Sequence, residues 1–569
     1  MRSRPLSQLA RWGRASLVLT ALAAAPAAGQ GHEHGHEDGH DHTARGTADE
    51  VPLYDDLGSH HHPITTDEPA AQRYFDQGFR LTYAFNHAEA IRSYREAARL
   101  DPDCAMCWWG VAWAAGPNIN AALDSAGAAR AYAAIQKARE RLDGVSEKER
   151  AYIEAMALRY GPDPLAERAR RDSAYARAMA RLAERYPDDP DAQVLAGEAL
   201  MLLSPWDYWT EDGEPKPGAE RLLDFLRPVT EKQPEHAGAC HFYIHAVEKA
   251  HPERAVPCAE RIADLMPGAG HVVHMPGHIY IRVGRYADAV EANRHAIHAD
   301  EGYFQEGSPG KTAYTLAYHP HNFHFLSYAA SMAGQSELAL ESARELAART
   351  DSTMMRRPGF GALQHYLVTP LRVMVRFGLW DEILAEPAPP RDLAYPMATW
   401  HYARGMALAR SGRLDAAAAE LEALRAALAD PALKKITVWD LNSTAALMQV
   451  AERVLAGELA AARGDYREAI AALEQGIRLE TELTYDEPPP WHLPVRHVLG
   501  AVLLEAGRPA EAEAVYRKAL QRFPENGWAL HGLRQSLNAQ GQMEKAATVE
   551  ARLREAWRAA DVELVGSRF

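Results

Sequence analysis

Histidine is the residue type with the clearest chemical potential in this chain, because 12 of its 26 histidines lie within residues 236–324. Neutral imidazole nitrogens bind zinc and copper when several rings face one point. His271, His274 and His278 recur at i, i+3 and i+7, which places them on one face of a helix. The segment therefore predicts one side of a transition-metal site.

Two further histidine pairs have the spacing that lets one helix offer two ligands to one ion. His321 and His324 are at i, i+3, and His241 and His245 are at i, i+4. Glu248 follows His245 within one turn and could either bind the metal or orient an imidazole. The spacing alone leaves open whether the His241 pair faces the same point as the other histidines.

A lone histidine on a helix is usually a surface residue or a hydrogen-bonded core residue, so the metal hypothesis depends on the recurrence. Histidine ligands with Met266 and Met275 nearby favour Cu or Zn over Mg²⁺ or Ca²⁺. A competing interpretation is a polar groove for an anionic or peptide ligand. Its candidate residues, besides the histidines above, are Arg282, His365, Arg372 and Arg376.

The common catalytic motifs are absent and indicate no alternative function. The chain has no G-x-x-x-x-G-K-[ST], no G-x-G-x-x-G and no G-x-S-x-G. The residues leave open whether the protein is an enzyme. If it is one, a metal-bound water or a metal redox step must carry the chemistry, as in a metal-dependent oxidase or hydrolase.

The N-terminal region predicts export. Residues 1–30 combine four arginines, a short apolar run and small residues around a cleavage site, the pattern of a signal peptide. The run is too short to cross a bilayer, so we expect a periplasmic or secreted protein without a membrane span after cleavage. Residues 31–64 are rich in His, Asp and Glu and predict a disordered segment able to take up transition metals.

An oxidising compartment permits disulfides between the four cysteines. Cys104 and Cys107 form a C-x-x-C, whereas Cys240 and Cys258 stand apart. We favour the bridges Cys104–Cys107 and Cys240–Cys258, although four cysteines allow three connectivities. A zinc knuckle would need two C-x-x-C pairs, and the chain has one.

The elements that position these residues must be helices in a large assembly. With 569 residues the chain exceeds a single core, which stops growing near ~250–300 residues, so it has several domains or a repeat array. Its 47% hydrophobic and 24% charged residues exclude a wholly disordered chain. A net charge of -15 argues against nucleic acid or an anionic membrane as partner.

A 34-residue pattern recurs along the chain. Gly78 is followed by Ala90, Tyr94, Ala97 and Pro102, and the same offsets recur at Gly500, Ala512, Tyr516, Ala519 and Pro524. Small residues let two antiparallel helices touch, the aromatic ring fills the seam, and proline ends the second helix. In these residues the chain resembles the tetratricopeptide repeat superfamily over most of residues 65–569.

The resemblance implies an all-α, right-handed solenoid whose concave groove is lined by the first helix of each pair. We expect N-terminal repeats over residues 65–350, which carry the histidines, and C-terminal repeats over residues 351–569. The segment Gly302–Tyr318 breaks the period and predicts a loop. Stretches such as CAMCWWG and GHVVHMPGHIY also resemble an uncharacterised group of exported bacterial tetratricopeptide repeat proteins, which implies fold and export but no activity.

In the repeat phase that the resemblance implies, the triplet beginning at His271 and the pair beginning at His321 occupy matching groove positions of adjacent repeats. We expect these imidazoles to converge on one ion. The leading hypothesis is an exported repeat protein that binds Cu or Zn through its groove histidines. The alternative is a protein–protein interaction scaffold that holds an extended peptide in the groove.

Overall fold

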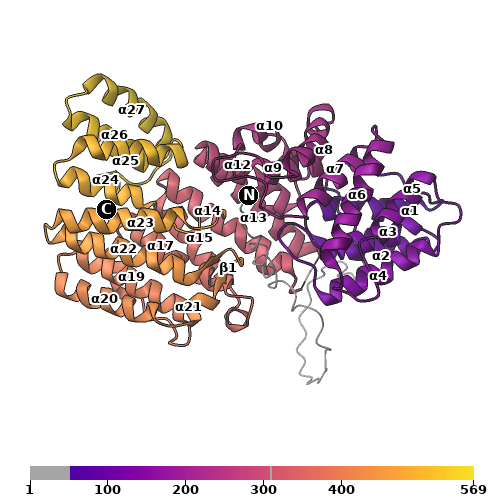
Figure 1. The fold of residues 1–569 in the computed structure, drawn as a ribbon, viewed down its shortest axis with the longest axis horizontal. Helices are drawn as coiled ribbons and strands as arrows, with labels where there is room; N and C mark the ends of the chain where they lie inside the picture. Colours follow the sequence, from indigo (N-terminus) through magenta and orange to yellow (C-terminus); the bar gives the residue numbers. More distant parts are fainter. Residues whose placement is uncertain (1–50, 308–309) are drawn as a thin grey trace, which may run out of the picture. The chain divides into compact units, whose positions relative to one another are not determined.

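The computed structural model describes residues 51–307 and 310–569, so the expected signal peptide and residues 31–50 lie outside the described residues. The chain forms two compact units, one ending at Leu326 and the other running from Ser327 to Phe569. We call them the N-terminal unit and the C-terminal unit (Figure 1). Both are helical, which confirms the all-α fold predicted from the sequence.

The N-terminal unit consists of helices that pack on their neighbours in the chain, as α1 does on α2 and α12 on α13. It also contains the 3-10 turn η1 (Pro252–Ala255) and the π-helical turn η2 (Tyr314–Tyr318). Its helices are α1 (Pro69–Tyr83), α2 (His87–Leu100), α3 (Ala105–Ala114), α4 (Ser125–Arg139), α5 (Glu147–Ala157), α6 (Arg168–Arg185), α7 (Pro190–Met201), α8 (Ala219–Lys232), α9 (Ala237–Val247), α10 (Val256–Ala259), α11 (Ile262–Leu265), α12 (Gly270–Val283), α13 (Tyr286–Gly307) and the start of α14 (His319–Ala333).

The C-terminal unit continues the same pattern of helix pairs, with one short antiparallel pair of strands, β1 (Thr437–Val438) and β2 (Asn442–Ser443). A 3-10 turn, η3 (Met354–Arg356), lies between α15 and α16. The helices after α14 are α15 (Ser336–Arg349), α16 (Ala362–Leu367), α17 (Thr369–Phe377), α18 (Trp380–Ala385), α19 (Ala394–Arg410), α20 (Leu414–Leu428), α21 (Ala432–Lys435), α22 (Thr444–Ala462), α23 (Tyr466–Thr481), α24 (Val495–Glu505), α25 (Pro509–Arg522), α26 (Gly527–Ala539) and α27 (Met543–Ala556).

Tyr94 on α2 shows why small residues recur at fixed offsets. Its ring is completely buried and lies between Gly78 on α1 and Gly110 on α3. A Cβ atom at Gly78 would lie 2.8 Å from the Tyr94 ring, so only glycine allows this approach. Tyr516 on α25 lies in the same way between two glycines of α24 and α26. Each unit therefore holds three successive helices together around one tyrosine.

The predicted boundary between the two sets of repeats and the predicted loop Gly302–Tyr318 both differ from the structure. The compact units divide at Leu326, and the expected boundary at residue 350 falls inside the C-terminal unit because α15 packs on α16 and α17. The expected loop Gly302–Tyr318 is wrong at both ends, since α13 continues to Gly307 and η2 is helical. Tertiary packing, which the repeat phase does not contain, decides both points.

Residues 51–64 pack on the N-terminal unit, whereas the sequence predicted disorder throughout residues 31–64. Leu57 is 3% exposed, and the side chain of Gln77 accepts a hydrogen bond from the backbone of Tyr54 at 2.8 Å. Low hydropathy predicted disorder, but a few apolar residues and side-chain hydrogen bonds to the backbone hold this segment.

Both favoured cysteine pairs are joined in the structure. Cys104 and Cys107 bridge the start of α3, with Cα atoms 5.4 Å apart. Cys240 and Cys258 join α9 to α10, with Cα atoms 5.2 Å apart. The second bridge therefore ties down the helix that carries His241.

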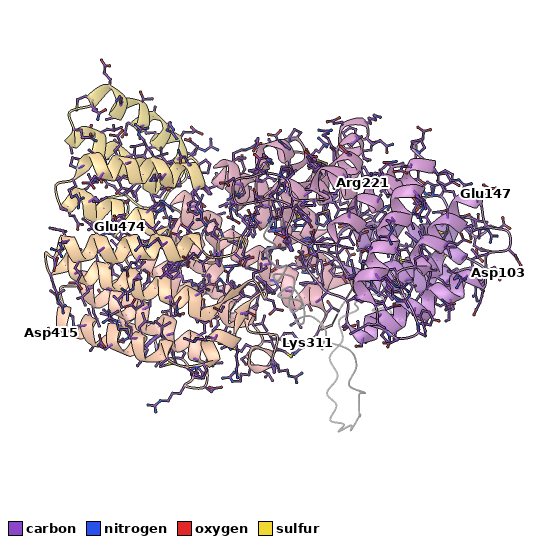
Figure 2. The ribbon with its side chains drawn as sticks, in the orientation of Figure 1. Asp103, Glu147, Arg221, Lys311, Asp415 and Glu474 are labelled. Atoms are coloured by element: carbon purple, nitrogen blue, oxygen red, sulfur yellow. A yellow bond between two sulfur atoms is a disulfide. The ribbon has the colours of Figure 1, made fainter. Side chains whose placement is uncertain are left out.

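Charged side chains occupy the outer surfaces of the helices, as Figure 2 shows for Glu147, Arg221 and Asp415. Among the residues that the structure describes, no helix has the combination of length and apolarity needed to cross a bilayer.

We expect Gly78→Ala to lower the free energy of unfolding by about 1–3 kcal/mol, the usual cost of overpacking a filled seam. The added methyl group would meet the ring of Tyr94, which cannot withdraw because Gly110 lies against its other side. Urea unfolding followed by circular dichroism measures the loss. Gly302→Ala is the control, because nothing lies within 4 Å of its Cβ position and alanine is the better helix former. Equal stability of the two variants would contradict the seam.

Candidate metal centre

Helix α9 packs against α1, α7, α8 and α12, and all 11 of its residues are buried. His241 and His245 are 0% and 2% exposed and lie one turn apart, so that their Nε2 atoms are 3.1 Å apart. Helix α12 adds His271, and the ligand nitrogens of the three residues lie within 4.8 Å of one another. We call His241, His245 and His271 the first histidine group.

Hydrogen bonds on the far side of the His241 and His245 rings fix which of their nitrogens carry hydrogen. The Nδ1 of His241 lies 2.6 Å from the carbonyl oxygen of Tyr83, which can only accept, so Nδ1 is the donor. The Nδ1 of His245 donates to Glu248 Oε1 at 3.4 Å. The two Nε2 atoms therefore face each other with lone pairs.

Two lone pairs at 3.1 Å repel each other unless a cation lies between them. Nitrogens that bind one tetrahedral ion at about 2.1 Å are about 3.4 Å apart, which is close to the observed separation. The alternative is an extra proton on His241 or His245, but burial lowers the pKa of both rings and opposes it. The geometry is thus that of a ligand pair.

His274 and His278 on α12 and His321 on α14 form a second histidine group, whose ligand nitrogens also lie within 4.8 Å of one another. The Nδ1 of His274 donates to Asn293 Oδ1 at 2.7 Å, and the Asn293 amide is oriented by its own bond to the α13 backbone. The Nδ1 of His278 lies 3.3 Å from Glu248 Oε2. In His274, therefore, Nδ1 is engaged and Nε2 is left for a metal.

The two groups are direct neighbours. The ring centroids of His245 and His278 are 5.5 Å apart, and those of His271 and His274 are 5.9 Å apart. Glu248, which is 0% exposed, reaches one ring of each group with its two oxygens. A single buried carboxylate thereby lies against one ring of each group.

Aromatic rings cover both groups. Phe85 lies 4.5 Å from His241, and Phe325 lies 4.6 Å from His274, between ring centroids. Two further rings touch the first group, Trp206 and Tyr318. The imidazoles are therefore surrounded by apolar surface, in which a bare charge is costly.

Burial lowers the pKa of all six imidazoles. The pKa falls to about 3 for His241 and for His278. The other four are lowered with burial as the largest cause: His245, His271, His274 and His321. All six rings are consequently neutral at pH 7, the form that binds metals.

The structure brings together six of the seven histidines predicted as ligands, but in two groups rather than around one point. His324 lies on α14 beside them and belongs to neither group within the described residues. Glu248 takes the orienting role, one of the two that the sequence allowed. Arg282, expected in the groove, donates to the backbone oxygens of Glu248 and Lys249 and so caps the end of α9.

The other predicted groove residues lie together in the C-terminal unit. His365 is on α16 and Arg372 is on α17, with Arg372 Nη1 2.8 Å from His365 Nε2. Arg376 follows one turn later and is 2% exposed.

Two orienting groups were missed from the sequence. Asn293 lies on the second helix of the pair and faces His274, a position that the repeat phase could have indicated. The carbonyl of Tyr83 lies 158 residues before His241 and carries no sequence signal.

A third cluster of histidines surrounds Asp191 at the start of α7, and its geometry favours hydrogen bonding. His62 Nδ1 lies 2.7 Å and His236 Nε2 lies 3.2 Å from the carboxylate, and Tyr83 donates to it at 2.8 Å. The Nδ1 of His236 accepts from the first turn of α9, so its Nε2 is the donor. Burial alone would raise the pKa of Asp191, but His60 and the other imidazoles hold it well below its usual range.

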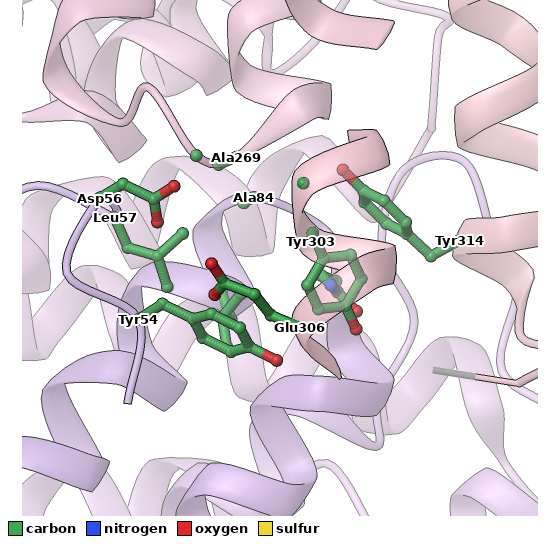
Figure 3. Close-up of a pocket in the computed structure, with 12 residues that line it drawn as sticks. Tyr54, Asp56, Leu57, Ala84, Ala269, Tyr303, Glu306 and Tyr314 are labelled. Carbon is green, nitrogen blue, oxygen red and sulfur yellow. The ribbon is translucent and has the colours of Figure 1, made fainter. Parts of the chain in front are cut away.

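A cavity of about 50 Å³ adjoins the start of α12. Figure 3 shows Tyr54, Tyr303 and Tyr314 around it. The hydroxyl of Tyr314 accepts from the backbone of His271 at 3.0 Å and donates to Asp300 at 2.7 Å. The cavity wall therefore supports the backbone of the first histidine group, although no imidazole lines it.

Comparison with known proteins finds a family match for the C-terminal part of the chain. Two family models described as tetratricopeptide repeat match residues 450–525 and 503–559. The cellulose synthase operon protein C of Xanthomonas axonopodis pv. citri (strain 306) is 38% identical over 102 residues. That match covers 18% of this chain and only 6% of the relative, so the chain spans a small part of that protein's length.

The solved structures that match the chain share little sequence with it. The APC/C hetero-tetramer Cut9–Hcn1 is 13% identical, with a TM-score of 0.30 over 87% of this chain and 78% of that chain. Yeast Tom70 is 11% identical, with a TM-score of 0.28 over 86% of this chain and 91% of that chain. We draw no conclusion about function from either structure.

We expect the metal-free protein to lose stability in acid. Unfolded histidines titrate near 6.5, whereas folded His241 and His278 titrate at about 3. Between these values the unfolded chain binds more protons, so the free energy of unfolding decreases as the pH falls, by about 1.4 kcal/mol per pH unit for each buried ring. The contribution of these histidines should be constant above about pH 7.5.

Urea unfolding of chelator-treated protein at pH 7.5, 6.5 and 5.5 measures this dependence. His278→Gln should reduce the slope, because one buried titrating group is removed. An identical pH dependence in the wild type and in His278→Gln would contradict the burial of neutral imidazoles.

Proposed function

Because the chain contains tetratricopeptide repeats and brings six imidazoles, five of them buried, into two adjacent groups, we propose that it binds a transition metal, copper or zinc, at each group. The observation that carries the proposal is the pair of Nε2 lone pairs of His241 and His245, 3.1 Å apart. Their Nδ1 hydrogens are committed to Tyr83 and Glu248, so a cation is the partner that suits them.

The donor set supports the choice of metal. Imidazole nitrogen suits copper and zinc, whereas Mg²⁺ and Ca²⁺ prefer oxygen ligands. Hydrogen bonds from Nδ1 to carboxylate, amide or carbonyl oxygens are the usual second layer around metal-binding histidines. Three protein ligands at each ion leave a position for water or a small molecule, so the proposal extends to an oxidase or hydrolase if that position is reached by substrate.

The repeats support a protein-interaction scaffold as well. The matched repeats span residues 450–559, entirely within the C-terminal unit, whereas both histidine groups lie in the N-terminal unit. We therefore propose that metal binding and contact with a protein partner belong to different units of the chain. Export to the periplasm or beyond, proposed from residues 1–30, agrees with the two disulfides.

We expect a chain that begins at residue 51 to bind two zinc or copper ions, since the histidines before it would add binding of their own. His241→Gln with His245→Gln should remove one ion, and His274→Gln with His321→Gln should remove the other. Elemental analysis after gel filtration gives the stoichiometry, and circular dichroism confirms folding. His295→Gln with His298→Gln is the matched control, because both rings are exposed on α13. Unchanged stoichiometry in both site variants would end the proposal.

We expect Glu248→Gln to weaken both sites at once, by about 10–100-fold in affinity, because one carboxylate orients a ring in each group. Competition with a chromophoric chelator measures the two dissociation constants. The His295 and His298 control variant should show neither loss. Weakening of a single site would show that Glu248 does not link the two groups.

A further inference from the structure

Helix α17 of the C-terminal unit carries two buried arginines one turn apart. Arg372 is 3% exposed and Arg376 is 2% exposed. A buried guanidinium costs free energy unless a counter-charge or a full set of hydrogen-bond acceptors compensates it. The surroundings of Arg372 show how that cost is met.

The groups next to Arg372 are neutral. Its Nη1 lies 2.8 Å from His365 Nε2, and its Nη2 contacts the hydroxyl of Tyr395. Its Nε has no hydrogen-bond partner in the described part of the chain. Burial lowers the pKa of Arg372, and the groups that oppose this shift are the hydroxyls of Tyr395 and Tyr402, with no carboxylate among them. The charge is therefore left without a counter-ion from the described residues.

Further buried polar atoms near Arg372 have no partner among the described residues. They are Trp491 Nε1, the hydroxyl of Tyr402 and both ring nitrogens of His492. The ring nitrogens of His497, which lies near Arg376, have no partner there either. The ring of Trp491 lies 5.5 Å from that of Tyr402 and 4.9 Å from that of His492, between centroids. Buried polar groups in proteins nearly always have a partner, so a cluster of donors beside a cation indicates a bound anion.

Arg376 adds positive charge on the same side. Its Nη1 donates to the backbone oxygen of His492 at 3.4 Å, and its guanidinium lies 4.6 Å from the centre of the Trp528 ring. Burial, together with nearby arginines, lowers the pKa of His492 and of His497. Both rings are therefore neutral, and each offers one N–H to an acceptor.

The loop before α24 brings the donors to α17. Trp491 and His492 follow three consecutive prolines that begin at Pro488, and Pro494 follows them. Proline restricts the backbone on both sides of the two residues, so the indole and the imidazole are held in place before any ligand arrives. A preformed set of donors is what a specific anion site requires.

We propose that the C-terminal unit binds a small oxyanion, a carboxylate, phosphate or sulfate group, beside Arg372. The guanidinium supplies the charge, and the N–H groups of Trp491 and His492 supply directed hydrogen bonds. Because these polar atoms are buried, a compact anion suits them better than an extended peptide. The site shares no residue with the histidine groups and does not depend on metal binding.

Isothermal titration of the full chain with sodium phosphate, sodium sulfate and sodium acetate, at constant ionic strength in chloride buffer, tests the site. At least one anion should bind, and the tightest of the three identifies the chemical class. Arg372→Gln should weaken that anion at least tenfold, since a charge-assisted hydrogen bond is worth about 1.5–3 kcal/mol. Arg413→Gln, which alters an exposed arginine of the same unit, should leave its affinity unchanged.

If Arg372→Gln does not fold, Trp491→Phe decides in its place, because it removes one N–H donor and keeps an aromatic ring. An affinity reduced several-fold supports the site, and an affinity equal to that of the wild type overturns it. When Arg372→Gln does fold, equal binding by this variant and the wild type overturns the proposal. Absence of binding for all three anions overturns it as well.

Discussion

A buried imidazole is stabilised when an acceptor takes its N–H hydrogen, and three rings of the two histidine groups have such an acceptor. A carbonyl, a carboxylate and an amide receive the Nδ1 hydrogens of three rings, from His241, His245 and His274. This arrangement aims the Nε2 lone pairs inward, where the surrounding aromatic rings exclude water. The result is a cluster whose electron pairs repel one another without a cation, and whose protonation is opposed by burial.

The helical repeat supplies this cluster by simple means. Glycine and tyrosine seams let successive helices approach closely, so α9 and α12 can present rings to one another across a short gap. The bridge between Cys240 and Cys258 and the Arg282 cap both hold α9 at its ends. A helix that carries ligands on every turn cannot rely on its apolar residues alone for position, and these contacts compensate for that.

Much of the fold could be predicted because its signals are local. The offsets from Gly78 to Tyr94 and from Gly500 to Tyr516 each mark a helix pair, and both seams exist in the structure. The i, i+4 spacing of His241 and His245 placed two ligand nitrogens on one helical face. Periodicity cannot measure how far apart neighbouring helices are, however, and so it could not separate one group of imidazoles from two.

Sequence spacing also cannot tell a ligand from a hydrogen-bond donor, as His236 and His241 on neighbouring turns demonstrate. His236 uses Nδ1 to accept from the first turn of α9, which forces its hydrogen onto Nε2 and directs that hydrogen to Asp191. His241 uses Nδ1 to donate to the carbonyl of Tyr83, which leaves Nε2 as a lone pair. Residues far away in the chain choose the tautomer, and the tautomer decides which histidine can hold a metal.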